Sequence, residues 1–133
     1  MKGHTFTKQE RLCGSKQVDR LFTRGNRGIA AFPVRLVWLL SDEPQDPAVV
    51  QVLISAPKRN FHHAVDRNRI KRQIREFYRV SSAPLKDAVA QGGRSLYLAI
   101  LYTGHRLADS AELHARLNSA TERLIEVLKE RQK

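Results

Sequence analysis

Basic side chains crowd into one stretch of this 133-residue chain, residues 58–79, and the chemistry open to them is phosphate binding. The stretch holds eight lysines and arginines against two acids, a net charge of +6. Lysine and arginine neutralise phosphates and release counterions, so a nucleic acid is the partner that such a cluster predicts. The basic residues are Lys58, Arg59, Arg67, Arg69, Lys71, Arg72, Arg75 and Arg79.

The remaining charge is also unevenly distributed. Residues 1–27 carry seven basic and two acidic side chains, a net of +5, which with residues 58–79 accounts for the whole formal charge of +11. The rest of the chain holds nine side chains of each sign. Two basic segments on a neutral scaffold predict a binding surface, because charge that served only solubility would not cluster in this way.

Candidates for catalysis or metal binding are few. The acids are scattered, so no carboxylate pair is placed for acid–base work, and no Walker loop or dinucleotide fingerprint occurs. The lone Cys13 excludes an intramolecular disulfide and points to a reducing compartment. His62 and His63 are adjacent and therefore diverge, so a shared metal is the least favoured role, while a phosphate contact and a plain surface role stay open. We expect no catalytic residue and no metal site on the chain.

A helical period runs through the basic stretch from about Ala64 onward. The apolar stripe at i, i+4 and i+7 consists of Ile70, Ile74 and Phe77, with Tyr78 on its flank. At about 100° per residue, the opposite side presents, within roughly 100°, the residues Asn68, Lys71, Arg72, Arg75 and Arg79. Only Arg72 and Glu76 form an opposite-charge pair at i, i+4, whereas an ordinary solvated face mixes signs. The pattern predicts a helix with one buried face and one cationic face.

Apolar periodicity and chain breakers locate the other elements. We expect a helix over 15–25, extended segments over 29–40 and 49–55, a helical turn over 85–90, a buried strand over 95–103 and a helix over 109–129. Pro33 should divide the first extended segment, since proline cannot donate to a ladder. The predicted fold is a single α+β domain over 1–133, a two-layer sandwich of helices against about four strands, with 1–10 and 130–133 loose.

The main strand after Pro33 alternates in character. Val34, Leu36 and Trp38 share one face, and Arg35 and Val37 lie on the other. A buried arginine is rare, so the face of Arg35 should meet solvent or a ligand. Which of Arg35, Val37 and Trp38 faces a ligand stays open, because the register of a strand is not fixed by its sequence alone.

The central run AVDRNRIKRQIRE, residues 64–76, resembles the AV-x-RNR-x-KR-xx-RE signature of the bacterial ribonuclease P protein component. Upstream, the match to that family's opening helix rests on Phe6, Lys8, Arg11, Leu12, Ser15, Leu21, Phe22 and Gly25. The resemblance covers nearly the whole chain in element order, and its central motif is long and specific. The sequence departs from the family pattern at Val18, where the family usually has phenylalanine, and at Leu53, where it commonly has glycine. Ser95 and Tyr102 replace the acidic and basic residues that usually stand at the two ends of the last strand.

The resemblance implies an α-β-β-β-α-β-α order with a left-handed βαβ crossover, like that of a ribosomal protein domain and an exception to the usual handedness. It implies a protein subunit of ribonuclease P that binds the catalytic RNA and the 5′ leader of precursor tRNA, and so promotes endonucleolytic maturation of the tRNA 5′ end. The RNA carries the hydrolysis with its Mg²⁺ ions, and the chain alone is not expected to be catalytic. The lone cysteine and the lack of a long apolar run or a signal peptide predict a cytoplasmic setting. The expected partners are the ribonuclease P RNA and precursor tRNA, with no DNA and no membrane.

Site residues follow from the same resemblance. The residues expected to bind RNA are Lys58, Arg59, Arg67, Asn68, Arg69, Lys71, Arg72, Arg75 and Arg79. Those expected in the leader cleft are Val18, Phe22 and Arg35. An alternative reading is a ribosomal-type or general RNA-binding protein without a processing role. A protein-only nuclease is disfavoured, because the chain lacks a carboxylate cluster.

Overall fold

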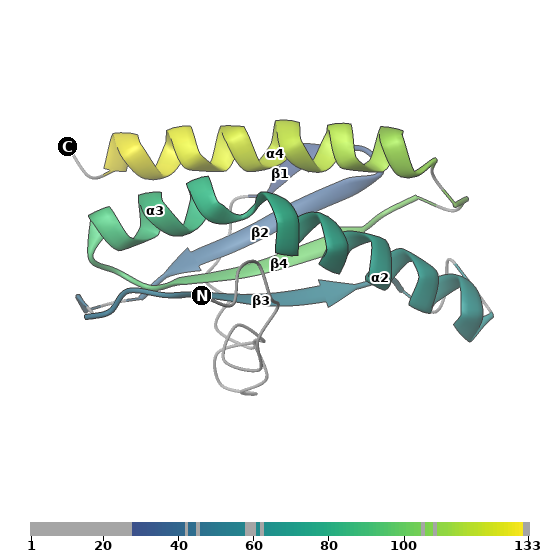
Figure 1. Cartoon of the computed structure of the whole chain (residues 1–133), viewed down its shortest axis with the longest axis horizontal. Coiled ribbons are helices and arrows are strands. Elements are labelled where there is room, and N and C mark those ends of the chain that lie inside the picture. The colour runs from purple at the N-terminus through teal and green to yellow at the C-terminus, as the bar shows by residue number, and fades with distance from the viewer. Residues whose placement is uncertain are drawn as a thin grey trace.

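The described part of the chain folds into a four-stranded sheet covered by helices, as a computed structural model shows (Figure 1). The structure describes residues 28–41, 43–44, 46–57, 61, 63–104, 106–107 and 109–131. The elements are β1 (Ile29–Ala31), β2 (Val34–Leu40), β3 (Val50–Ser55), α2 (Ala64–Ser81), α3 (Ala83–Gly92), β4 (Leu96–Tyr102) and α4 (Ser110–Arg131). The helix expected over 15–25, with Val18 and Phe22, lies outside the described residues, as do Lys58, Arg59 and His62.

The sheet has the strand order β1-β2-β4-β3. β1 and β4 both pair antiparallel with β2, while β3 and β4 are parallel. The break between β1 and β2 falls at Phe32 and Pro33, where the sequence predicts it. The last strand in the sequence, β4, therefore lies in the middle of the sheet, between β2 and β3.

The parallel pair β3–β4 needs a crossover connection, and α2 and α3 supply it. Figure 1 shows the described helices on one face of the sheet, toward the viewer. When Figure 1 is turned so that β3 and β4 point upward, with the helices still facing the viewer, β4 lies to the left of β3. The crossover is left-handed, and the predicted two-layer α+β sandwich is confirmed.

Strand β2 shows the predicted alternation. Val34, Leu36 and Trp38 are buried under the helices in the main core, and Arg35 is exposed on the opposite face. Val37 also lies on that opposite face, in a small second cluster with Ala99. The register left open by the sequence is thus settled: Arg35 and Val37 share the face that the described helices leave open, and Trp38 belongs to the core.

Helix α2 buries the predicted stripe, with Ile70, Ile74, Phe77 and Tyr78 all in the core. Helix α4 does the same with leucines at helical spacing, since Leu113, Leu117 and Leu124 are fully buried. Both helices follow the sequence prediction because an apolar stripe must face the sheet to leave water.

Residues 83–92 form a full helix, α3, where the sequence suggested only a turn over 85–90. Leu85 and Val89 lie one helical turn apart, and both are buried. Gly93 ends the helix in the left-handed conformation, with φ 74°, and its N–H bonds back to the carbonyls of Val89 and Ala90. The segment is short and partly polar, so its sequence alone does not predict a full helix, and tertiary packing stabilises it.

Two buried serines join three strands at one end of the sheet. The Ser95 N–H donates to the Oγ of Ser41 at 3.1 Å, and the Ser41 Oγ donates to the carbonyl of Glu43 at 2.9 Å. The Val49 N–H donates to the Oγ of Ser95 at 3.0 Å. Backbone groups at the ends of β2, β3 and β4 are satisfied in this way without a charged side chain.

Truncating the core under α4 should destabilise the protein strongly. We expect Leu117→Ala to lower the free energy of unfolding by about 2–5 kcal/mol, because it leaves a cavity at a fully buried site. Val65→Ala is the matched control, since Val65 is 77% exposed and should change stability by no more than about 0.5 kcal/mol. Urea unfolding followed by circular dichroism measures both, and equal midpoints would contradict this packing.

Candidate nucleic-acid interface

The cationic face of α2 is the main candidate interface. Because the apolar stripe of the helix is buried, the opposite side must face solvent. The exposed members of the predicted set are Asn68, Arg69, Arg72, Arg75 and Arg79, and the half-buried ones are Arg67 and Lys71. At about 100° per residue, Asn68, Lys71, Arg72, Arg75 and Arg79 project within roughly 100° of arc. We call these five residues the cationic face.

Arg67 differs from its neighbours in the RNR run. Its place on the helix turns it toward the buried side, and its Nη1 donates a hydrogen bond to the carbonyl of Phe61 at 2.8 Å. The ring of Phe61 is buried and lies 5.7 Å, centroid to centroid, from that of Tyr102 at the end of β4. Arg67 therefore ties the start of α2 to the segment that precedes it, while Asn68 and Arg69 stay exposed.

Glu76 is the acidic residue that faces this surface. It pairs with Arg79 at i, i+3, and not with Arg72 at i, i+4 as the sequence spacing suggests. The Arg79 Nε donates to Glu76 Oε2 at 3.1 Å. That hydrogen bond, with the charge of Arg79, holds the pKa of the Glu76 carboxyl below its usual value and raises the pKa of the Arg79 guanidinium. Both side chains are about half exposed, so solvent screens the pair.

The second candidate surface is the face of the sheet that the described helices leave open. Arg35 lies there on β2, opposite Leu101 of β4, which in turn is opposite Ser55 of β3. The guanidinium of Arg35 lies over Gly28, where an added Cβ would overlap its Nε, so the arginine would have to move aside for any side chain at this position. Glycine at position 28 thus lets Arg35 lie back across the edge strand.

Tyr97 and Gln51 are residues of this open face that the sequence analysis missed. They are opposite each other in the β3–β4 register, and both are half-buried. The strand over 95–103 reads as apolar almost throughout, which suggested burial on both faces. Its alternation was nevertheless visible, because Tyr97, Ala99 and Leu101 occupy every second position and fall on the open face.

The structure brings the α2 residues together but separates them from Arg35. Arg35 and the cationic face lie on opposite sides of the sheet. The register that pairs Arg35 with Leu101 continues across the sheet to Ser55, the last residue of β3, after which the chain leads to α2. The positions of Lys58, Arg59, Val18 and Phe22 lie outside the described residues, so their expected roles stay predictions. Within the described ranges, no group of three or more His, Cys, Asp or Glu side chains is arranged to hold a metal ion. Within those ranges, too, no helix is long and apolar enough to cross a bilayer.

The sequence has relatives along most of its length. A family model described as Ribonuclease P matches residues 6–125. The ribonuclease P protein component of Porphyromonas gingivalis is 33% identical over 97 residues, which is 73% of this chain and 68% of the relative. That of Chlorobaculum tepidum is 37% identical over 94 residues, 67% of this chain and 61% of the relative.

Two solved structures share the fold. The RNase P protein of Staphylococcus aureus aligns with a TM-score of 0.67 at 18% identity, covering 85% of this chain and 93% of that one. The RNase P protein of Thermotoga maritima aligns with a TM-score of 0.64 at 15% identity, covering 86% and 96%. At such identities the likeness supports the architecture alone, and it agrees with the α+β sandwich derived above.

Two arginines of the RNR run should differ in their effect on stability. We expect Arg67→Ala to lower the free energy of unfolding by about 0.5–1.5 kcal/mol, because it removes the hydrogen bond to the Phe61 carbonyl. Arg69→Ala, at an exposed position two residues away, should stay within about 0.5 kcal/mol. Urea denaturation of the two variants makes the comparison, and the same loss in both would mean that the Phe61 contact contributes nothing.

Proposed function

Because this chain belongs to the Ribonuclease P family, as a protein component of that tRNA-processing endoribonuclease, we propose that it binds the catalytic RNA subunit through α2 and the 5′ leader of precursor tRNA through the open face of the sheet. The RNA-binding set is the cationic face with Arg67 and Arg69, together with Lys58 and Arg59. The leader cleft takes Arg35 from β2 and Val18 and Phe22 from the N-terminal segment. The proposed setting is the cytoplasm.

The observation that supports this proposal most directly is the cationic face itself. Four of its five members are cations, and Glu76 pairs with only one of them, Arg79. Like charges on one side of a helix repel each other, and a polyanion removes that cost when it binds. Asn68 adds an amide among the cations, which can hydrogen-bond a phosphate, a 2′-hydroxyl or a base edge.

The open face of the sheet suits a single strand better than a duplex. Arg35 supplies a cation for the backbone, and Tyr97 supplies an aromatic ring in the same layer. Flat aromatic groups beside cations bind unpaired nucleotides with little sequence preference, because every base has a face on which to stack. A leader differs in sequence from one precursor to the next, so binding of this kind is what the substrate requires.

Bond cleavage is assigned to the RNA partner. Mg²⁺ prefers carboxylate and other oxygen ligands, and the cationic face offers arginine, lysine and asparagine instead. The residues present do not fit a Mg²⁺ site, so we derive no step through the metal on this chain. The chain would bind and orient the two RNAs, and Mg²⁺ held by the catalytic RNA would supply the activation of water.

Reconstitution with a bacterial ribonuclease P RNA at low Mg²⁺ tests the proposal. We expect the chain to stimulate cleavage of precursor tRNA, and to do so more strongly when the substrate carries a 5′ leader. The double variant Arg72→Ala/Arg75→Ala should lose most of this stimulation, whereas Arg116→Ala, an exposed site on α4, should keep it. A chain that binds RNA yet stimulates neither substrate would instead be a general RNA-binding protein.

Affinity for the catalytic RNA should depend steeply on salt. If about six phosphates are neutralised, log affinity should fall against log salt concentration with a slope of about −4 to −5. Removing Arg72 and Arg75 together should make the slope shallower by about 1 to 2, since each lost contact releases one counterion fewer. Filter binding from 50 to 300 mM salt measures the slope, and a nearly flat line would rule out the cationic face as the contact surface.

A further inference from the structure

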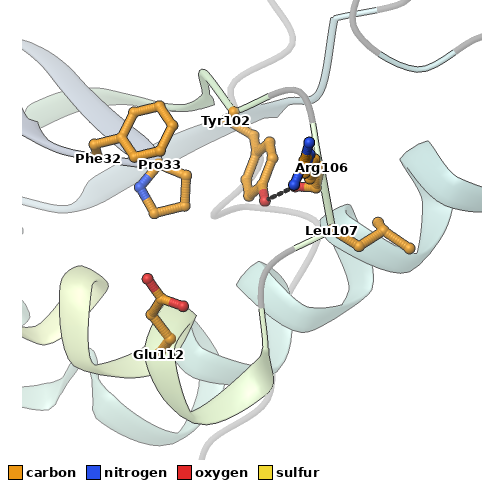
Figure 2. A pocket seen from close by; sticks show the side chains of 7 residues that line it. Phe32, Pro33, Tyr102, Arg106, Leu107 and Glu112 are labelled. Carbon is orange, nitrogen blue, oxygen red and sulfur yellow. Dashed lines mark hydrogen bonds between the residues drawn. The ribbon is translucent and has the colours of Figure 1, made fainter.

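A pocket of about 340 Å³ opens at the end of the sheet where β4 leads into α4. Figure 2 shows its walls: Phe32 and Pro33 from the turn between β1 and β2, the ring of Tyr102, and Glu112 from the first turn of α4. In that view the Glu112 carboxylate points from the helix into the space in front of Pro33. The pocket thus combines apolar walls with one anionic hydrogen-bond acceptor.

The wall of this pocket consists of a fixed tyrosine, a glycine with little space around it and an exposed phenylalanine. The Tyr102 side chain is 1% exposed, and its hydroxyl donates a hydrogen bond to the backbone carbonyl of Arg106 (Figure 2). This bond holds the ring in position. At Gly104 an added Cβ would lie 3.0 Å from Pro33 and 3.2 Å from the Tyr102 ring, so a side chain there would crowd the same space. Phe32, in contrast, is 71% exposed at the rim, so most of its side chain is open to solvent.

We propose that this pocket binds an unpaired guanine of an RNA partner, with the base against Phe32 and its Watson–Crick edge on Glu112. A carboxylate rejects phosphate but accepts N–H donors. Guanine is the one common base with two adjacent donors on that edge, N1–H and the N2 amino group, and a carboxylate can accept both at once. The aromatic ring of Phe32 offers the stacking surface that a planar base needs.

The position of the pocket connects it with the proposed interface. Tyr102 in its wall contacts the ring of Phe61, and the Phe61 carbonyl accepts the hydrogen bond of Arg67. An RNA on the start of α2 therefore passes close to the rim. Arg106, exposed beside the pocket, adds a cation for the phosphate of the same nucleotide. The inference rests on the proposed function only in taking RNA as the partner.

Nucleotide titration of the full chain, followed by NMR of its backbone amides, tests the pocket without the catalytic RNA. We expect 5′-GMP to shift the resonances of Gly104, Leu107 and Glu112. Inosine 5′-monophosphate lacks only the N2 amino group and should bind about tenfold more weakly, and AMP should bind at least as weakly as inosine 5′-monophosphate. Glu112→Gln should remove most of the preference for GMP over AMP, while Glu122→Gln, exposed on the same helix, should leave it unchanged.

Phe32→Leu separates stacking from edge recognition. It keeps an apolar side chain at the rim but removes the ring, so GMP and AMP should both weaken by about tenfold while their ratio is kept. The proposal is overturned if the three nucleotides bind equally, if only α2 resonances shift, or if Glu112→Gln changes nothing. It is also overturned if arginine amide fills the pocket and GMP does not, since the partner would then be a cationic protein side chain. Failure to stimulate the catalytic RNA would count against the proposed function and not against this pocket.

Discussion

The packing of the α2 stripe on the sheet is the constraint on which the rest of the molecule depends. With Ile74 and Phe77 buried, the helix cannot roll about its axis to spread its charges. The cations must then share one side, and their repulsion is relieved only in part by the pair between Glu76 and Arg79. Since the sequence outside the two basic segments is neutral, the resulting field is local and directed, which is the condition for a defined contact with a polyanion.

Elements with a local burial pattern could be predicted from the sequence, and those that depend on distant neighbours could not. The stripes of α2 and α4 and the alternation of β2 repeat every few residues, so the sequence alone indicates which face leaves water. The Ser41–Ser95 hydrogen bond joins positions 54 residues apart, and the open-face role of Tyr97 follows from β4 lying between β2 and β3. The serine hydrogen bond has no signal in either segment, because strand order brings the two residues together. The alternation of β4 was visible in the sequence, but both of its faces are apolar, and this hid which of them the described helices leave open.

The RNR run shows the same limit at the scale of one helical turn. Its two arginines carry the same side chain and charge, yet Arg67 hydrogen-bonds the Phe61 carbonyl and Arg69 faces solvent. The difference arises because they are two positions apart, which places them about 200° apart around the helix. One motif therefore both anchors the start of α2 and exposes an amide and a cation to solvent.

Tyr102 extends this reasoning to the end of β4, where the resemblance leads one to expect a basic side chain. A cation there would add one more phosphate contact of no sequence preference. The buried tyrosine instead contacts Phe61 and, through its hydroxyl, fixes the loop that carries Arg106. In place of a long-range attraction it provides a pocket wall opposite Glu112, an acidic residue near the surface that we propose binds RNA. An acid so placed weakens phosphate binding, so its position is intelligible if the group it meets is the hydrogen-bonding edge of a base.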